Sequence, residues 1–461
     1  MFEYKISEIL KATNGKLIKG NKDDILKGIS TDSRNLKEED IFIALVGDNF
    51  DAHNFIDEKL TNNIKAIIVE KEVESDVKNI IQVDNTTKAL QELAKYHRLR
   101  NKNVKVIGIT GSSGKTSTKD ILFNILNQKY NVKKNKGNLN NHIGVPLTLF
   151  RMEGNEDFFI VEMGMSSFGE IKLLSEIANP VVGLITNVGQ AHIEFFNSVE
   201  EIAKAKGELI ESLDEDGLAV LNIDNPYTDI IKDMLKNNID VKYFGFTERA
   251  DFCITDYNMT RSGMEFSIKN NNKIIDLKTN LFGKYNLYNI ISSIAIARYY
   301  NVDWSQIKKA LKNIKLTDMR SQIEQVDNIK FINDCYNANP LSMKNAIDLL
   351  DEIEGNKKFA ILSDMLELGD IKEKAHREIG EYITTKNIDY LLTYGQLGEY
   401  ITKGAQNTNN ENLFIKHFKN KSEIINYIKR TSNKNDVILI KGSRGMKMEE
   451  IFNNYQKDKE G

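Results

Sequence analysis

Residues 109–119, ITGSSGKTSTK, are the most informative segment of the sequence. They follow a short apolar segment, VKVIGIT at 104–110, and they lead into a segment that reads as a helix. A strand, a glycine-containing turn and a helix in this order are the context of a phosphate-binding loop. Gly111 and Gly114 can adopt positive φ, so the backbone can approach an anion closely. Successive N–H groups at the start of the helix would then bind phosphate, and the segment predicts nucleotide binding.

The side chains of this loop have separate expected tasks. Lys115 is expected to reach the β- and γ-phosphate oxygens, and the hydroxyl of Thr116 to bind Mg²⁺. The loop is shorter than the full pattern of its class, because Ile109 occupies the place of the first glycine. A glycine turn beside a surface lysine is the alternative. The residues expected at the nucleotide are Thr110, Gly111, Ser112, Ser113, Gly114, Lys115, Thr116 and Ser117.

Outward from the loop, apolar segments alternate with helical ones. Buried strands are expected at 158–163, 181–188 and 218–223, and helices at 287–300 and 304–314 end this part of the chain. Strands that alternate with helices are typical of a doubly wound parallel sheet covered on both faces. Ligands bind at the carboxyl ends of such strands.

The flanking segments have α/β patterns of their own. The first hundred residues mix short strands, at 40–45 and 65–70, with a helix at 86–100, and a third pattern begins near residue 315. A length of 461 residues exceeds what one hydrophobic core usually supports. We therefore expect an α/β protein with a smaller N-terminal domain at 1–102, a central P-loop-type domain at 103–314, and a Rossmann-like C-terminal domain at 315–461.

Composition excludes several classes of protein. Lys and Arg number 63 against 66 Asp and Glu, a net charge of −3, so the overall charge gives no indication of a nucleic-acid or membrane partner. The cysteines, Cys253 and Cys335, are far apart and suit a reducing compartment. No apolar run approaches the roughly 18 residues that span a bilayer, and the first residues lack the features of a signal peptide. We expect a cytoplasmic protein without membrane insertion.

The shortened loop resembles the ATP loop of the Mur ligases and of the related folylpolyglutamate synthetases. The segment KGNLNNHIGVPLTL, 136–149, resembles the part of the D-alanyl-D-alanine-adding Mur ligases that faces the peptide of their precursor. Further segments resemble the same enzymes, namely STDSR at 30–34, IALVGDNFDAHNF at 43–55, DCYNANP at 334–340, SDMLELG at 363–369 and KGSRGMKME at 441–449. The resemblance thus covers all three expected domains in the order of the family.

This resemblance implies an ATP-dependent, ADP-forming ligase of peptidoglycan precursor synthesis. ATP would phosphorylate the terminal carboxylate of UDP-N-acetylmuramoyl-tripeptide, and the amine of D-alanyl-D-alanine would displace phosphate from the acyl phosphate. The N-terminal domain would bind the UDP precursor and the central domain ATP, while the C-terminal domain would bind the dipeptide and close over ATP. We expect a monomer with these small molecules as its substrates.

The resemblance also implies a site with two Mg²⁺ ions, in which Lys115, Glu162, His192 and Lys206 are catalytic. Glu162, at the end of an expected strand, offers a hard oxygen ligand beside Thr116. His192 is implied as a ligand of the second ion, and Lys206 as the carrier of a CO₂-derived carbamate, which requires a deprotonated amine. A strand-end ion pair, a loop histidine and a solvated helix lysine remain the alternatives, and Lys204 is a near neighbour of Lys206.

The remaining nucleotide contacts are implied by the same resemblance. Asn286 and Asn289 would bind the adenine edge, although helical spacing also suits a capping and solvent pair. Arg320 would reach the γ-phosphate, for which a guanidinium is suited because it binds oxyanions in a bidentate way. Asp334 would bind the ribose, or it could be the N-cap of a helix.

Substrate contacts are expected in all three domains. Ser33 and Arg34 would bind the uridine diphosphate, or they only form a turn. A dipeptide offers an ammonium and a carboxylate, so we expect Asp364 or Glu367 at the first and Arg444 at the second. The full expected set comprises Ser33, Arg34, Asn138, Asn140, Asn141, Asn337, Asn339, Asp364, Glu367, Lys441, Ser443 and Arg444. The sequence is equally compatible with a site role and a structural role for His376, and it assigns no role to His53.

Two other functions remain open. The chain could be a ligase that adds the third amino acid of the precursor, or a folylpolyglutamate synthetase, although segments 140–149 and 334–340 argue against both. It could also be a P-loop regulatory ATPase, which would hydrolyse ATP without any amine acceptor.

Overall fold

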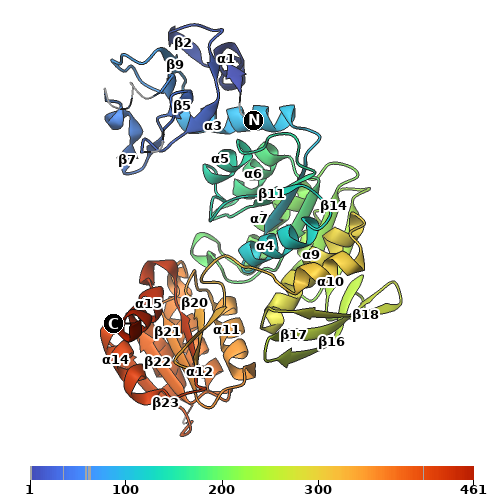
Figure 1. The fold of residues 1–461 in the computed structure, drawn as a ribbon, viewed down its shortest axis with the longest axis vertical. Coiled ribbons are helices and arrows are strands. Elements are labelled where there is room, and N and C mark those ends of the chain that lie inside the picture. Colours follow the sequence, from blue (N-terminus) through green and yellow to red (C-terminus); the bar gives the residue numbers. More distant parts are fainter. Residues whose placement is uncertain (1–2, 35, 58–59, 61–63, 409, 461) are drawn as a thin grey trace.

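The computed structural model describes residues 3–34, 36–57, 60, 64–408 and 410–460. In this part of the chain, three α/β regions follow one another, each built on its own main sheet (Figure 1). The α/β fold class predicted from the alternating pattern is confirmed. No helix within the described residues is long and apolar enough to cross a membrane.

The main sheet of the N-terminal region has the strand order β2-β9-β8-β5-β4. These strands are β2 (Lys16–Lys19), β9 (Asn79–Gln82), β8 (Ala66–Val69), β5 (Asp40–Ile43) and β4 (Gly28–Ser30). Short pairs are formed by β1 (Tyr4–Lys5) with β3 (Ile25–Leu26) and by β6 (Val46–Gly47) with β7 (Phe50–Asp51), which η1 (Ala52–Phe55) follows.

Helix α3 (Thr86–Arg100) connects this region to the next. α1 (Ile6–Thr13) packs on α3, whose N-cap residue Asn85 accepts the N–H of Lys88. α3 has the predicted bounds, and it also packs on α5 (Gly144–Leu149) and α6 (Glu170–Ala178) of the central region. A continuous hydrophobic core therefore extends from the N-terminal region into the central one.

The sheet of the central region has the order β11-β12-β10-β13-β14-β15-β16-β17-β18. It runs parallel from β11 to β16 and ends in an antiparallel extension. The bounds are β10 (Lys105–Thr110), β11 (Val132–Lys134), β12 (Phe158–Glu162), β13 (Val182–Ile185), β14 (Leu218–Asn222), β15 (Asp240–Gly245), β16 (Phe252–Thr260), β17 (Gly263–Asn270) and β18 (Lys273–Thr279).

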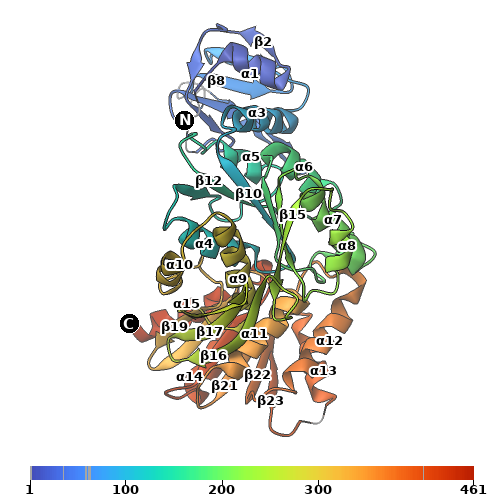
Figure 2. The same cartoon turned by 90° about the vertical axis from the view of Figure 1, so that its right-hand side faces the viewer.

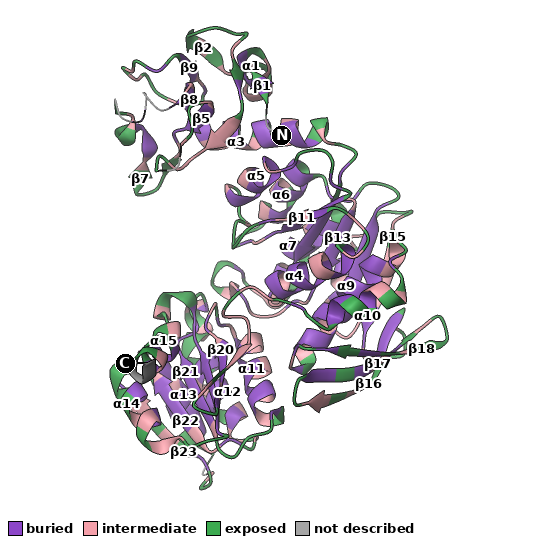
Figure 3. Ribbon diagram, viewed as in Figure 1, coloured by how far each residue is buried: buried purple, intermediate pink, exposed green. Residues whose placement is uncertain are grey.

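Helices cover both faces of the parallel part of this sheet. On one face lie α4 (Lys115–Leu126), α9 (Lys284–Tyr299) and α10 (Trp304–Leu311). The other face carries α5, α6 and α7 (Val199–Glu211), and α8 (Thr228–Lys232) packs on α7. Val106 of β10 packs toward the second face and Ile107 toward the first, as the two-residue period of a strand requires. The parallel strands are mostly buried (Figure 3).

The C-terminal sheet has the order β19-β20-β24-β21-β22-β23, with only its edge pair β19–β20 antiparallel among the described strands. Its strands are β19 (Gln322–Val326), β20 (Ile329–Asp334), β21 (Lys358–Ser363), β22 (Tyr390–Tyr394), β23 (Phe414–Phe418) and β24 (Val437–Lys441). The helices are α11 (Pro340–Glu352), α12 (Lys372–Ile383), α13 (Gly398–Gln406), α14 (Lys421–Thr431) and α15 (Glu449–Glu460).

The C-terminal region lies against the central region, whose α9 packs on α11 (Figure 2). Short 3₁₀ helices, η2 (Ile193–Phe195) and η3 (Gly369–Ile371), also meet across this junction, while η4 (Arg444–Met446) follows β24. The loops after β10, β12, β20 and β24 consequently share one space between the two regions.

Candidate active site

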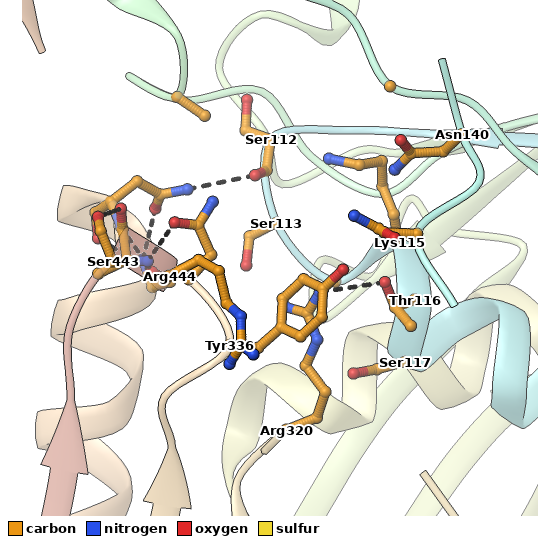
Figure 4. A pocket seen from close by; sticks show the side chains of 18 of the residues that line it. Ser112, Ser113, Lys115, Thr116, Ser117, Asn140, Arg320, Tyr336, Ser443 and Arg444 are labelled. Carbon is orange, nitrogen blue, oxygen red and sulfur yellow. Dashed lines mark hydrogen bonds between the residues drawn. The ribbon is translucent and has the colours of Figure 1, made fainter. Parts of the chain in front are cut away.

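A cavity of about 740 Å³ lies between the central and C-terminal regions. Most of the predicted site residues line it (Figure 4). They are Ser112, Ser113, Gly114, Lys115, Thr116, Ser117, Asn138, Asn140, Asn141, Glu162, His192, Asn289, Arg320, Asp334, Asn337, Asn339, Glu367, Lys441, Ser443 and Arg444. The cavity lining does not include Ser33, Arg34, Thr110, Gly111, Lys206, Asn286 or Asp364.

The phosphate loop connects β10 to α4, and its glycines are required by its backbone. Gly114, the N-cap residue of α4, has φ 82°, and a Cβ on it would lie 2.5 Å from Asn289 Oδ1. Gly111 has φ 149°, and a Cβ there would overlap the hydroxyl of Thr186. Asn187 Oδ1 accepts the N–H of Ser113 at 2.9 Å, which fixes the loop against the end of β13. The N-terminus of α4 is thereby held at the cavity, where its N–H groups favour an anion.

Lys115 lies over this loop, and its Nζ donates to the Gly111 carbonyl at 2.6 Å. Burial lowers the pKa of this ammonium, and the carboxylate of Glu162 opposes that change. A lysine that is withdrawn from water beside a set of N–H donors is suited to an anionic ligand.

Glu162, at the end of β12, is 2% exposed. Its carboxylate accepts hydrogen bonds from Lys119 Nζ at 3.1 Å and from Asn140 Nδ2 at 2.9 Å. Burial opposes ionisation, but Lys119, Lys115 and Asn140 together hold the pKa of Glu162 below its ordinary value. Glu162 therefore carries a negative charge at the cavity wall.

Lys119 is a residue of this site that the sequence interpretation missed. It is 1% exposed, and its Nζ also donates to the Gly137 carbonyl at 3.2 Å. It stands four residues after Lys115, so both lysines project from the same side of α4, and this spacing was an available signal. Lys119 links the carboxylate at the end of β12 to the loop at 136–141.

Asn135, which directly precedes segment 136–141, anchors this loop as well. Its Oδ1 accepts the backbone N–H of Glu162 at 3.1 Å, and its Nδ2 donates to the Leu139 carbonyl at 3.1 Å. The Asn140 carbonyl accepts the N–H of Gly164 at 2.8 Å. The asparagine-rich segment is therefore held beside Glu162 by backbone and side-chain bonds.

His192 joins the two regions across the cavity. It has φ 61°, and its Nδ1 lies 2.6 Å from Oε2 of Glu367, which also has φ 61°. The approach of His192 lowers the pKa of Glu367 below its ordinary value. In this structure the partner of His192 is thus one of the two carboxylates, Asp364 and Glu367, that were the candidates for the dipeptide ammonium.

Arg320 connects the C-terminal side of the cavity to the phosphate loop. Its Nη2 donates to Thr116 Oγ1 at 3.1 Å, and its guanidinium carbon lies 3.7 Å from the ring centroid of Tyr336 (Figure 4). Tyr336 was not among the predicted residues, although it lies within the quoted segment 334–340. Asn339 adds a second link, because its Nδ2 donates to the Ser112 carbonyl at 3.2 Å.

Lys206 on α7 is 1% exposed, whereas Lys204 is exposed. Burial, aided by the charge of Lys115, lowers the pKa of the Lys206 amine well below its ordinary value. The reading of Lys206 as a solvated helix lysine is therefore wrong.

Asn286 and Asn289 are 2% and 5% exposed, so the reading of them as a solvent pair is wrong. Asn289 Nδ2 donates to Asn286 Oδ1 at 3.0 Å, and Asn289 Oδ1 accepts the Thr118 hydroxyl at 3.1 Å. Asn286 Nδ2 donates to the Phe282 carbonyl at 2.8 Å. This network fixes both amides beside the start of α4.

Asp334 is not a helix N-cap, because the N-cap of α11 is Asn339, whose Oδ1 accepts the N–H of Ser342 at 2.9 Å. One Asp334 oxygen accepts the N–H of Ser321 at 2.9 Å, and the other pairs with the buried ammonium of Lys441. This carboxylate therefore braces the loops after β20 and β24.

The two acidic candidates for the dipeptide are placed differently. Asp364 is 6% exposed and accepts the N–H of Gly398 at 2.7 Å, while Glu367 lines the cavity. Arg444 also lines it, with Nη1 2.9 Å from Glu449 Oε1. Ser443 Oγ accepts the N–H of Leu366 at 2.9 Å, which ties the loop after β24 to the loop after β21.

Other predicted residues have local roles in the described structure. Arg34 is exposed in the N-terminal region and pairs with Asp32 at 2.8 Å. His376 is fully buried, accepts the N–H of Met365 at 2.8 Å, and is therefore a structural residue. His53 is buried against Asp51, with its Nδ1 2.6 Å from Oδ1. Among the described residues there is no cluster of three or more His, Cys, Asp or Glu side chains suited to a metal ion.

A phosphate loop that faces the strand ends of a second parallel sheet across one polar cavity defines a multidomain nucleotide-dependent enzyme. The chain matches the Mur ligase middle domain over residues 109–297 and the Mur ligase glutamate ligase domain over residues 319–444. The chain therefore belongs to the Mur ligase family, whose members are ATP-dependent ligases that form amide bonds.

Full-length relatives agree with this membership. The chain is 38% identical over 458 residues to a UDP-N-acetylmuramoyl-tripeptide–D-alanyl-D-alanine ligase of Bacillus subtilis, with 98% of each chain covered. It is 32% identical to the enzyme of that name from Escherichia coli, with 99% of each covered. Among solved structures, MurF from Acinetobacter baumannii matches with a TM-score of 0.92 and 29% identity over 99% of both chains. MurF of Thermotoga maritima in complex with ADP matches with a TM-score of 0.84 and 30% identity, covering 94% of this chain and 98% of that one.

Proposed function

We propose that this chain joins D-alanyl-D-alanine to UDP-N-acetylmuramoyl-tripeptide at the expense of ATP, in the synthesis of peptidoglycan precursors. Relatives with this activity in their names match nearly the whole chain, which supports a ligase over a regulatory ATPase. The observation that carries the proposal is the shared cavity, in which a phosphate loop, a buried carboxylate and charged groups of the C-terminal region face one another. A ligase needs all three, because it brings a nucleotide, a carboxylate and an amine together.

The chain's own cations would stabilise the transferring phosphoryl group. The N–H groups at the start of α4 bind the phosphates, and Lys115 and Arg320 offset the negative charge that accumulates around the γ-phosphorus. Asn286 and Asn289 would lie at the adenine, and Asp334 would lie at the ribose. Of the two asparagines, only Asn289 lines the cavity.

The residues present fit one Mg²⁺ ion that is shared with the nucleotide. Glu162 and Thr116 offer oxygen ligands at the same cavity wall, and Mg²⁺ usually takes one or two carboxylates together with substrate phosphates. When bound, Mg²⁺ would reduce the repulsion between phosphate and carboxylate and polarise the γ-phosphate. We propose His192 as a ligand of a second ion, for which it would have to leave Glu367.

Lys206 is suited to carry a carbamate. Its amine is buried and its pKa is lowered, so the neutral form that attacks CO₂ is more accessible than at an exposed lysine. The amine would form a C–N bond to CO₂ and lose a proton, and the product is an anion with two oxygens. A ¹³C resonance of a carbamate after incubation with ¹³C-bicarbonate, absent in Lys206→Ala, tests this step without any measurement of turnover.

The reaction would proceed in two displacements. A carboxylate oxygen of the precursor bonds to the γ-phosphorus while ADP leaves, which creates an acyl phosphate. The dipeptide amine then bonds to the carbonyl carbon, loses a proton, and phosphate leaves from the tetrahedral intermediate. The chain contributes chiefly the positions of these groups, because a carboxylate lacks an acceptable leaving group until it is phosphorylated.

Substrates would extend across all three regions. We propose that segment 136–141, held beside Glu162, faces the precursor peptide through Asn138, Asn140 and Asn141. Glu367 and Arg444 would take the dipeptide ammonium and carboxylate, and Ser33 and Arg34 the uridine diphosphate. We further propose a cytoplasmic monomer with domains at 1–102, 103–314 and 315–461, since ATP and nucleotide-linked precursors are cytoplasmic substrates.

The test is phosphate release from ATP with purified nucleotide-linked tripeptides and a panel of acceptors. Release should require both a precursor and D-alanyl-D-alanine. Release with single amino acids in place of the dipeptide would point to another member of the family, and release with neither substrate would favour a regulatory ATPase.

A further inference from the structure

Arg320 lies in the segment that joins the central and C-terminal regions, and its backbone is fixed from both. Its neighbours Met319 (φ 61°) and Ser321 (φ 48°) adopt left-handed conformations, which are uncommon for residues other than glycine. The N–H of Ser321 donates to Asp334 Oδ1 at 2.9 Å, on the C-terminal side. The Ser321 hydroxyl accepts a hydrogen bond from Tyr285 of α9, on the central side. The point from which the Arg320 side chain departs is therefore defined.

The guanidinium has two contacts and one donor that is left without an acceptor. Nη2 donates to Thr116 Oγ1 at 3.1 Å, and one face of the group stacks on the Tyr336 ring with a distance of 3.7 Å to the centroid. Nε is buried and has no hydrogen-bond partner among the described residues. A buried donor without an acceptor is unfavourable, so the group is arranged for an acceptor that a ligand in the cavity would supply.

We propose that Tyr336 is a positioning residue that holds the Arg320 guanidinium for the γ-phosphate of ATP. The proposal rests on the proposed function, in which Arg320 binds that phosphate. A ring face attracts a cation most strongly where water is excluded, and Tyr336 is half-buried at the cavity wall. The ring also limits the conformations of a long side chain before the nucleotide arrives, which leaves less entropy to lose on binding.

The contact that defines this role is with the ring face. Phenylalanine preserves that face, whereas leucine keeps an apolar side chain and removes the ring. If Tyr336 instead contacted the adenine or ribose, its loss would weaken ADP and ATP analogues to the same extent. If Tyr336 positions Arg320, its loss weakens the binding of only those nucleotides that carry the γ-phosphate.

The experiment measures the affinity of the full chain for Mg²⁺-ADP and for the Mg²⁺ complex of the β,γ-imido analogue of ATP by titration calorimetry. Tyr336→Leu should lower the affinity for the analogue about tenfold and change the affinity for ADP by less than about twofold. Tyr336→Phe should restore the wild-type ratio of the two affinities. Retained ADP binding shows in the same titration that Tyr336→Leu is folded.

Two controls separate the possible failures. Tyr400→Leu removes a ring of the same region that lies 4.9 Å from the guanidinium carbon of Arg377, outside the cavity, and should leave both affinities unchanged. Arg320→Met should lower the ratio of the affinity for the ATP analogue to the affinity for ADP, as Tyr336→Leu does. If Arg320→Met lowers the ratio and Tyr336→Leu leaves it unchanged, the positioning role of Tyr336 is overturned and the proposed function stands.

Equal weakening of ADP and the analogue by Tyr336→Leu also overturns the positioning role. If Arg320→Met leaves the ratio unchanged, the γ-phosphate contact of the proposed function fails, and the role of Tyr336 fails with it. None of these titrations depends on the precursor or the dipeptide, so they are independent of the phosphate-release assay.

Discussion

Replacing Lys119 by Met should destabilise the central region strongly, because it leaves the carboxylate of Glu162 buried without its nearest cation. The two side chains are 2% and 3% exposed, so solvent screens their interaction little. At 3.1 Å and an effective dielectric constant of about 20, their attraction is about 5 kcal/mol. Much of this offsets the cost of burying both charges, but removal of one partner typically costs about 3–5 kcal/mol. We expect the free energy of unfolding to fall by that amount.

Urea unfolding followed by tryptophan fluorescence measures this change, because Trp304 is the single tryptophan and lies in α10 of the central region. Lys278→Met is the matched control, since its pair with Glu265 is 71% and 49% exposed and should contribute at most about 1 kcal/mol.

A double-mutant cycle measures the interaction between Lys119 and Glu162 directly. Glu162→Gln should also destabilise the region, but the double variant, Lys119→Met with Glu162→Gln, should lose about 2 kcal/mol less than the sum of the single losses. Additivity within about 0.5 kcal/mol would show that the two groups do not stabilise one another, contrary to this expectation.

Three further outcomes are expected. Gly114→Ala should weaken ADP binding by at least about tenfold in calorimetry, because φ is 82° and the added Cβ would lie 2.5 Å from Asn289 Oδ1; wild-type affinity would contradict the assigned loop geometry. Lys206→Ala should abolish phosphate release and regain part of it with added short carboxylic acids, whereas Lys204→Ala should retain activity; unimpaired turnover of the first variant would remove it from the site. Burial lowers the pKa of His97 from 6.5 to about 4, so below pH 6.5 the unfolded chain binds a proton that the folded chain does not, and stability is lost as pH falls. Between pH 7.5 and pH 4, the free energy of unfolding from urea titrations should fall by about 3 kcal/mol more for the wild type than for His97→Gln. Equal decreases in the two proteins would contradict this assignment.

The parallel sheets could be predicted from the sequence because their strands are buried on both faces. Residues 158–161, for example, form a continuous apolar run, and β12 (Phe158–Glu162) begins with it. The polar residue at its end, Glu162, could likewise be placed at a ligand-facing edge, because the carboxyl ends of parallel strands converge.

The antiparallel extension β16–β18 was not predicted, since its strands have a half-exposed pattern and include exposed apolar residues such as Ile274, 68% exposed. A signal was nevertheless present at Asn271 and Asn272, which both have positive φ, 47° and 61°, in the turn between β17 and β18. Adjacent residues of this kind favour a tight hairpin.

Contacts between distant segments could not be derived from the chain alone. His192 and Glu367 were given separate roles, yet they lie 2.6 Å apart. Their pairing depends on how the central and C-terminal regions dock, which no local pattern encodes. The same holds for Tyr336, whose contact with Arg320 requires the fold of the segment between them.

The proposed reaction depends on the claim that a carboxyl group of the precursor is activated by direct transfer of the γ-phosphoryl group. A precursor labelled with ¹⁸O in its terminal carboxylate tests this claim when mass spectrometry is applied to the phosphate released with ATP and D-alanyl-D-alanine. Each released phosphate should carry one ¹⁸O, because the bridging oxygen leaves with phosphorus when the amine attacks the carbonyl carbon. Phosphate without ¹⁸O, formed together with the coupled product, would contradict it.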